Sequence, residues 1–222
     1  MDRNEDLSPR LQTVASLIPC CETVADVGSD HGKLGVFCLR ENVCKKVIAT
    51  DIHELPAMRT KKRMIEENFE KRSEVLVTDG LKGVPLSSDM TAVIAGMGGL
   101  EICKILSAAL HFEKPVPKGM SFVIQPQRSF YEVRDFLSKN GFSIQDEKIS
   151  LERGHFYVVI FAVYNGVAYD LSGEELFLGP LILKNRPQYY EEYIAHEEKL
   201  MKKRALGEEK CAELLKNWEK YL

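Results

Sequence analysis

Carboxylates and glycines gather in one short segment near the start of the chain, in an order typical of a ligand-binding turn. The segment Thr23–Gly28 is apolar and β-branched apart from Asp26, and Ser29, Asp30 and His31 follow it. In an open α/β sheet, a glycine turn between strand and helix places backbone N–H groups where nucleotide-like ligands bind. The G-x-G-x-x-G pattern that admits a pyrophosphate is missing, because Ser29 and Asp30 replace it. A carboxylate repels a diphosphate but tolerates the ammonium and sulfonium of S-adenosylmethionine (SAM), which favours a methyltransferase over a dehydrogenase.

Further acids follow the next predicted strands. Asp51 lies 23 residues beyond Gly28 (51 − 28), the separation expected of an acid that binds ribose hydroxyls. Asp79 is placed to accept from the adenine amine, although Asp-Gly is also a strong turn pair. Asp26 faces the methionine amino group, holds the loop, or does both. The expected cofactor-binding residues are Asp26, Gly28, Ser29, Asp51, Ile52, Asp79, Gly80, Ala95, Gly96 and Met97.

The segment Ala95–Gly99 holds three glycines, which let backbone approach a ligand. Enzymes that methylate exocyclic amines usually carry an Asn/Asp-Pro-Pro-aromatic box at this point, and this chain has none. A ring nitrogen such as adenine N1 has its own lone pair, so an enzyme need only align it and stabilise the charge that develops. The sequence therefore favours a ring nitrogen as the target.

Alternating apolar and helical segments predict an α/β fold, a doubly wound parallel sheet with one reversed edge strand. A first helix begins at Ser8-Pro9 and ends at Pro19. Strands are expected at 23–28, 46–51, 74–79, 91–97 and 120–125, and helices at 33–40, 54–69, 100–110 and 129–140. Segments 142–152 and 155–164 predict an antiparallel hairpin that turns at Arg153-Gly154. Helical spacing after Pro187 predicts a helical hairpin, which divides the chain into domains 1–166 and 167–222.

Composition excludes some classes. The 222 residues carry a net charge of −3, so any nucleic-acid surface must be a local patch. The first six residues are polar, and no apolar stretch is long enough for a bilayer, so a cytoplasmic protein without a secretory leader is expected. The six cysteines form no C-x-x-C pair, which predicts reduced thiols and no metal site.

Five motifs together resemble the bacterial TrmK family, whose members are tRNA (adenine(22)-N1)-methyltransferases. They are Leu7–Leu11, Asp26–His31, Ile94–Gly99, Ile124–Pro126 and Leu178–Pro180. The resemblance implies a class I Rossmann-like SAM methyltransferase sheet with a C-terminal, coiled-coil-like helical hairpin. It also implies tRNA as the substrate and Asp30 as a residue important for catalysis.

The chain departs from the family pattern beside the expected site. Lys33 replaces an aromatic residue, Gly35 a proline and Gln127 an asparagine. Strand two ends in Thr50-Asp51 where relatives commonly have Gly-Glu. Base recognition is therefore where this chain differs most from the family.

The mechanism expected is direct transfer of the SAM methyl group to adenine N1, with Asp30 accepting from the exocyclic N6 amine. His31 is expected to pack beside the substrate rather than act as a base. The expected substrate-binding residues are Arg10, His31, Lys33, Gln125, Gln127 and Arg128. Phosphate contacts are expected from Arg10, Lys33, Arg128, Arg134 and the cluster Lys202–Arg204.

Two other functions stay open. One is a small-molecule methyltransferase, disfavoured because the chain has no long insertion for a substrate lid. The other is a non-catalytic SAM-binding RNA module that uses the helical hairpin as its main contact. No protein partner is evident, and the oligomeric state is open, with a monomer favoured.

Overall fold

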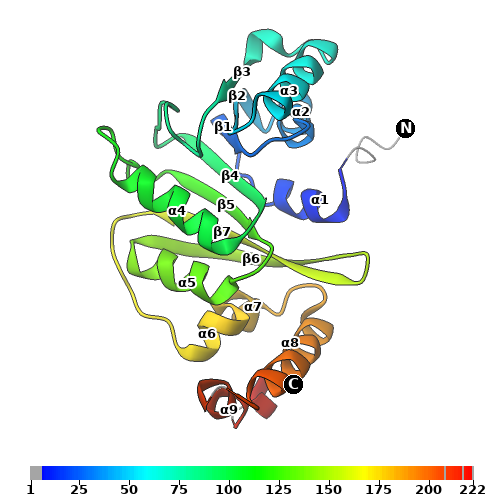
Figure 1. Cartoon of the computed structure of the whole chain (residues 1–222), viewed down its shortest axis with the longest axis vertical. Coiled ribbons are helices and arrows are strands. Elements are labelled where there is room, and N and C mark those ends of the chain that lie inside the picture. The colour runs from blue at the N-terminus through cyan, green and yellow to red at the C-terminus, as the bar shows by residue number, and fades with distance from the viewer. Residues whose placement is uncertain (1–6, 208, 217, 222) are drawn as a thin grey trace.

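A computed structural model describes residues 7–207, 209–216 and 218–221. Over these residues the strands form one seven-stranded sheet in the order β3-β2-β1-β4-β5-β7-β6 (Figure 1). The strands are β1 (Cys21–Val27), β2 (Cys44–Asp51), β3 (Ser73–Val77), β4 (Met90–Met97), β5 (Ser121–Pro126), β6 (Phe142–Glu152) and β7 (His155–Tyr164). Strands β1 to β5 pair in parallel, which brings their carboxyl ends to one edge of the sheet.

Helices cover both faces of the sheet, and each face has its own apolar core. The helices are α1 (Pro9–Ala15), α2 (Lys33–Arg40), α3 (Glu54–Glu66), α4 (Gly99–Leu110), α5 (Phe130–Lys139), α6 (Gly173–Leu178), α7 (Pro180–Asn185), α8 (Tyr190–Arg204) and α9 (Glu209–Leu215), with short 3₁₀ turns at Glu70–Arg72 and Trp218–Tyr221. Successive strand residues alternate between the cores: Ile94 packs with α4 and α5, whereas Val93 packs with α1 and α2. Burial on both faces explains the nearly continuous apolar strand sequences.

The predicted hairpin is confirmed at both of its bounds. Arg153 and Gly154 have φ of +51° and +78°, as a two-residue hairpin turn requires. The position expected for the reversed strand is wrong, because β7 lies between β5 and β6 and so β6 forms the edge. The physical reason is composition: β7 is apolar along most of its length, whereas β6 carries Gln145, Asp146 and Lys148, which suit an exposed edge.

The C-terminal segment holds two helices that the sequence analysis missed, α6 and α7. Ser172 begins α6 in a capping box with Glu175, each side chain bonding to the other's backbone N–H. Beyond them, α8 and α9 pack together, and the buried Tyr193 of α8 and Trp218 of the last 3₁₀ turn join the core beneath α4 and α5. The domain boundary at residue 166 stays a prediction. Within the described residues, the helices are all too short or too polar to cross a membrane.

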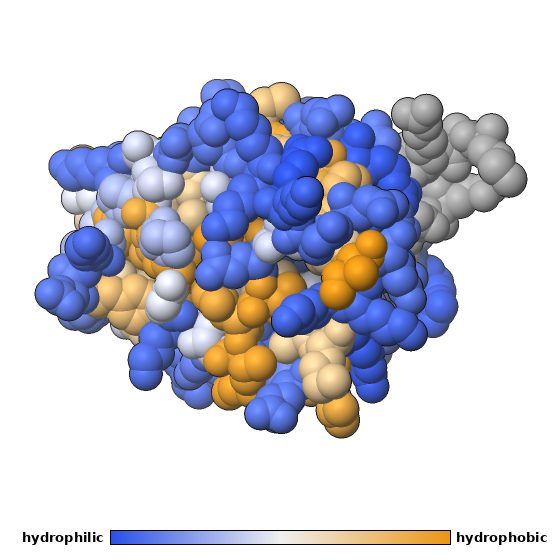
Figure 2. Space-filling view, turned by 90° about the horizontal axis from the view of Figure 1, so that it is seen from above, coloured by the Kyte–Doolittle hydropathy of each residue, from blue (hydrophilic) through white to orange (hydrophobic). Residues whose placement is uncertain are grey.

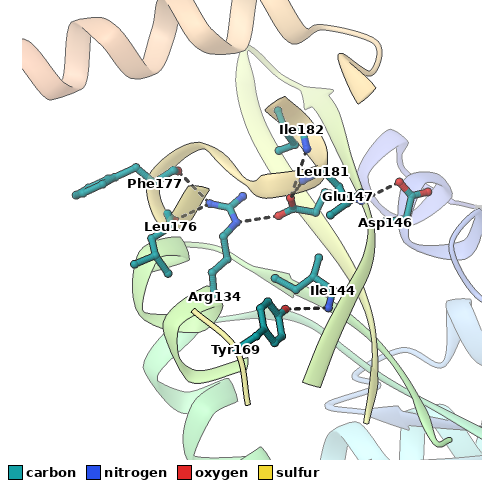
Figure 3. Close-up of polar contacts among 9 residues, drawn as sticks. All are labelled: Arg134, Ile144, Asp146, Glu147, Tyr169, Leu176, Phe177, Leu181 and Ile182. Atoms are coloured by element: carbon teal, nitrogen blue, oxygen red, sulfur yellow. Dashed lines mark hydrogen bonds and ion pairs between the residues drawn. The ribbon is translucent and has the colours of Figure 1, made fainter. Parts of the chain in front are cut away.

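Arg134 was expected to contact phosphate, and this prediction is wrong. Its side chain is fully buried, and its Nε lies 2.8 Å from Oε1 of Glu147 (Figure 3). It also donates to the carbonyls of Leu176 and Phe177, while Oε2 of Glu147 accepts from the N–H of Leu181. Burial is the largest single effect on the pKa of Arg134 and lowers it, but the combined charge and hydrogen-bond effects of Glu147 and Tyr193 outweigh burial and raise the pKa. The ion pair therefore joins α5 and β6 to α6 and α7.

Removing one partner of this pair should strongly destabilise the protein. We expect Arg134→Met to lower the free energy of unfolding by roughly 3–5 kcal/mol, because Glu147 then stays buried and unpaired. The double variant Arg134→Met/Glu147→Leu should cost less than the sum of the single variants. Urea unfolding measures all three. As control, Lys45→Met removes the exposed pair with Glu22 (76% and 51% exposed side chains) and should cost at most about 1 kcal/mol. Additive single effects would contradict the interpretation.

Candidate active site

A strained turn after β1 forms the centre of the site. Gly28 and Ser29 donate their N–H groups to the carbonyl of Thr50, at 2.8 and 3.2 Å. The backbone is left-handed at Gly28 (φ +73°) and at Asp30 (φ +47°). A Cβ atom at Gly28 would lie 2.2 Å from Cε of Met97, so the Met97 side chain covers this glycine closely. The turn therefore favours glycine for its left-handed conformation, whereas the Met97 methyl group lies at the end of a flexible side chain that can move.

Two cavities meet at Gly28, which lines both. The first, about 250 Å³, lies on the side of α1 and α2; its walls include the predicted residues Arg10, Asp26, Gly28, Ser29, Asp30, His31, Lys33, Ala95, Gly96 and Gln127. The second, about 280 Å³, lies between the loops after β2 and β3; its walls include Gly28, Asp51, Ile52, Asp79, Gly80 and Met97. The structure thus brings every predicted cofactor residue to one of two adjoining cavities at the carboxyl edge of the sheet.

Asp26 is the least ordinary group in the first cavity. The residue is only 6% exposed, and its Oδ2 has no hydrogen-bond partner within the described part of the chain. Burial raises the pKa of Asp26 to about 7, against a smaller lowering by a hydrogen bond from the backbone of Gly35. A buried carboxylate without a partner is unfavourable unless a cation or donor comes to it. Asp26 is therefore suited to bind a ligand's ammonium group.

Asp30 lies at the rim of the same cavity with its side chain 59% exposed. Its Oδ2 is 3.3 Å from Nε2 of His31, and its Oδ1 is 3.6 Å from Nη1 of Arg59. Behind the turn, the hydroxyl of Thr60 donates to the carbonyl of Asp30 and lies 3.0 Å from the hydroxyl of Ser29. These contacts hold an accessible carboxylate at the mouth of the cavity, with His31 beside it.

Gln125 lies behind the glycine loop instead of in the cavity. It is fully buried, and its Oε1 accepts from Nη1 of Arg10 at 2.7 Å and from the N–H of Gly96 at 3.1 Å. Its Nε2 donates to the carbonyl of Pro126. The amide therefore positions Arg10 and Gly96, and it is Arg10 and Gln127 that face the space where a substrate would enter.

The second cavity contains residues that the sequence analysis did not single out. Thr50 donates its hydroxyl to the carbonyl of Gly80 at 2.8 Å, which joins the loops after β2 and β3. Ile105 of α4 packs against Gly80, 2.8 Å from where a Cβ atom would lie. A strand-end threonine beside an expected ligand acid is the only signal that could have pointed to Thr50, since Ile105 reads as an ordinary core position.

The mouth of the second cavity is partly apolar. Asp51 accepts the N–H of His53 through Oδ1, and the neighbouring Ile52 is 60% exposed. Leu55 and Met58 of α3 are also exposed, and apolar patches interrupt the polar surface at this end of the molecule (Figure 2). β3 ends at Val77, so Asp79 lies in the loop and not at the strand end as predicted.

The last predicted residue, Arg128, lies away from both cavities. It lines a third cavity between α5 and α8, although its Nε comes within 3.7 Å of the position of a Cβ atom on Gly98. Metal chemistry finds no support in the described residues, which contain no group of three or more His, Cys, Asp or Glu side chains suited to hold an ion.

Acids and a glycine turn at the carboxyl edge of a 3-2-1-4-5-7-6 sheet define a class I methyltransferase domain. Comparison with known proteins agrees: the family model described as a methyltransferase domain matches residues 7–160. The tRNA (adenine(22)-N(1))-methyltransferase of Bacillus subtilis is 29% identical over 187 residues, which cover 81% of this chain and 76% of that protein.

Solved structures give the same result. The crystal structure of the B. subtilis m1A22 tRNA methyltransferase TrmK has a TM-score of 0.77 at 26% identity, covering 96% of this chain and 94% of the other. M. capricolum TrmK, solved with S-adenosyl-homocysteine, has a TM-score of 0.80 at 22% identity, covering 98% of both chains. At this identity the similarity shows a shared fold. The chain belongs to the methyltransferase domain family and, within it, to the TrmK family.

The buried carboxylate should make the ligand-free protein less stable as pH rises. The pKa of Asp26 is about 7 in the folded state, above its value of 3.8 as a model group, so the native state binds more protons between these values. Stability is then lost as pH rises through this window. Asp26→Asn removes this loss and should stabilise the protein at pH 8 by roughly 1–3 kcal/mol.

Thermal unfolding of both proteins between pH 5 and pH 8 measures the difference. The control, Asp170→Asn, changes an exposed acid and should follow the wild type at every pH. An Asp26→Asn variant whose melting temperature parallels the wild type across this range would contradict the assignment.

Proposed function

We propose that this protein transfers the methyl group of SAM to N1 of adenine 22 in tRNA. The observation that carries the proposal is the buried, unpaired Asp26 carboxylate beside Gly28, where two cavities adjoin. A pyrophosphate would be repelled there, whereas an ammonium would be attracted. Family membership supports the reaction, since the B. subtilis relative is named for methylation of this base.

The two cavities divide SAM between them. The methionine end fits the first cavity, where Asp26 pairs with its ammonium, and the adenosine end fits the second, where Asp51 accepts from the ribose hydroxyls. Asp79 accepts from the adenine amine, and the exposed Ile52 lies beside the ring. SAM supplies an electrophilic methyl group. The product complex of the M. capricolum relative with S-adenosyl-homocysteine supports this choice of ligand.

The target base enters at the rim of the first cavity. N1 lies on the Watson–Crick edge, so the adenine must be unpaired and turned out of its stack. Asp30 accepts from the N6 amine, which orients the ring and stabilises the positive charge that develops on the base. The N1 lone pair attacks the methyl carbon while the bond from that carbon to sulfur breaks, so S-adenosyl-homocysteine leaves with the electron pair on sulfur. Gly96 leaves room for the ring, and the cations Arg10 and Lys33 lie beside it for the RNA phosphates. With tRNA as substrate, the expected location is the cytoplasm.

Methyl transfer to transfer RNA tests the function directly. Purified protein, radiolabelled SAM and an unmodified tRNA transcript should give label in 1-methyladenosine after digestion to nucleosides. A transcript with guanine at position 22 should take up no label. SAM binding without transfer would instead favour a non-catalytic RNA module, and transfer only to small acceptors would favour a small-molecule enzyme.

Asp30 should act on the chemical step and not on cofactor binding. We expect Asp30→Asn to lower kcat at least about 100-fold, because the amide removes the negative charge that faces the forming cation. The Kd for SAM, measured by calorimetry, should stay within about threefold of wild type, since Asp30 is at the exposed rim. Asp170→Asn serves as the matched control with unchanged kcat. Near-normal turnover by Asp30→Asn would refute this role.

A further inference from the structure

The third cavity, here termed the α5–α8 cavity, is the largest of those that adjoin the site. Its volume is about 650 Å³, within the range of small-ligand sites. The start of α5 forms one wall with Arg128 and Tyr131, α6 contributes Phe177, and α8 contributes Glu197 and Arg204. Nothing in the proposed reaction at Asp26 and Asp30 makes use of this space.

The α5–α8 cavity adjoins the first cavity, at whose rim the target base is proposed to enter. Gln127 lines both the first cavity and this one. Arg128, the next residue, lies over the glycine loop that forms the wall of the acceptor site. A chain that places one base in the first cavity therefore meets the α5–α8 cavity next.

Two aromatic rings in this cavity are held in place from behind. The rings of Tyr131 and Phe177 lie 4.8 Å apart at an interplanar angle of 53°. Arg134 donates to the carbonyl of Phe177, and the Phe177 side chain points away from the buried ion pair (Figure 3). Arg134 thus holds the backbone at the end of α6, and the ring of Phe177 packs against Tyr131.

The charged groups of the cavity suit a ligand that carries both an anion and hydrogen-bond donors. Arg128 and Arg204 supply guanidinium groups that bind phosphate. Glu197 supplies a carboxylate in a half-buried position, where burial raises its pKa against the opposing effect of Arg134 and Arg204. A carboxylate in such a place accepts from the amino groups of a base edge.

We propose that the α5–α8 cavity binds a second unpaired nucleotide of the same RNA, stacking its base on Phe177 and Tyr131 and contacting phosphate through Arg204 and Arg128. The inference rests on the proposed function and extends it, since it says how the enzyme holds RNA beyond the target base. Aromatic stacking combined with arginine is how proteins bind single-stranded RNA. A concave, polar space beside the acceptor site fits one nucleotide better than a protein surface.

Steady-state methylation of full-length tRNA separates stacking from charge. Phe177→Leu keeps an apolar side chain but removes the ring, and should raise the KM for tRNA about five- to a hundredfold. Its kcat and its KM for SAM should stay within twofold of wild type. The slope of log KM against log salt should not change, because no phosphate contact is lost.

Arg204→Gln should behave differently. It should raise the KM for tRNA and reduce that salt slope by about 0.7 to 0.9, the effect of one lost phosphate contact. The matched control is Lys199→Gln, which removes a charge from an exposed residue of the same helix, outside the cavity wall, and should leave the KM within twofold. If Lys199→Gln shifts the KM and the slope as far as Arg204→Gln, the general charge of α8 is responsible and the proposal is overturned.

A crosslinking measurement on the wild type makes the test independent of variant folding. tRNA transcripts with a photoreactive base beside position 22 should crosslink to peptides that contain Tyr131 or Phe177. Crosslinks confined to other peptides, or a wild-type KM for both Phe177→Leu and Arg204→Gln, overturn the second site while methylation by the wild type stands. Absence of any methylation by the wild type overturns the proposed function first, and this inference with it.

Discussion

The backbone of Thr50 is the point on which the site depends. Its carbonyl accepts the N–H groups of both Gly28 and Ser29, and its hydroxyl donates to the carbonyl of Gly80. One fully buried residue at the end of β2 thus fixes the turn after β1 and the loop after β3. Parallel pairing of Val27 with Thr50 sets this arrangement, so a shift of register would move Asp26 of β1 relative to Asp51 of β2 and to Asp79 in the loop after β3. The geometry of the ligand site is in this sense a consequence of strand pairing.

A second constraint holds the C-terminal helices against the sheet. The Arg134–Glu147 pair gains its stability from hydrogen bonds as much as from charge, because Glu147 also accepts from the start of α7 and Arg134 also donates to the end of α6. Gly179, between the two helices, has no room for a side chain: a Cβ atom would lie 2.6 Å from Oε2 of Glu147. A buried ion pair adds little net stability over an apolar pair, so what it supplies here is a defined position for the helices.

The sequence predicts most of the fold and the identity of the ligand edge. Strand–helix alternation gave α2 and both hairpin strands at their observed bounds, because each is marked locally by apolar periodicity and turn residues. The same alternation does not predict that β7 lies between β5 and β6, because the order of the two hairpin strands depends on which of them better tolerates an exposed edge. The Ser172 and Glu175 capping box is visible in the sequence as a signal for a helix start, but it was not recognised, and α6 was therefore not predicted.

Side-chain burial was the least predictable feature of the site. Arg134 and Gln125 both look like surface residues in sequence, yet each is fully buried because distant segments supply its partners. Arg134 meets Glu147 on another element, and Gln125 meets Arg10 across 115 positions of sequence. Such pairings follow from tertiary packing and leave no local signal.

The charge of the whole chain is a poor guide to RNA binding in this molecule. Salt limits the reach of exposed charges to roughly 8–10 Å at physiological ionic strength, so an RNA phosphate responds to the nearest side chains and not to the net charge of −3. Arg10 and Lys33 line the first cavity, and Arg128 and Arg204 line the α5–α8 cavity. Asp26, by contrast, is buried in the wall of the first cavity, beyond the reach of an RNA phosphate at the surface. In the proposed function, the buried Asp26 faces the sulfonium nucleoside, and the cations nearer the surface face the polyanion.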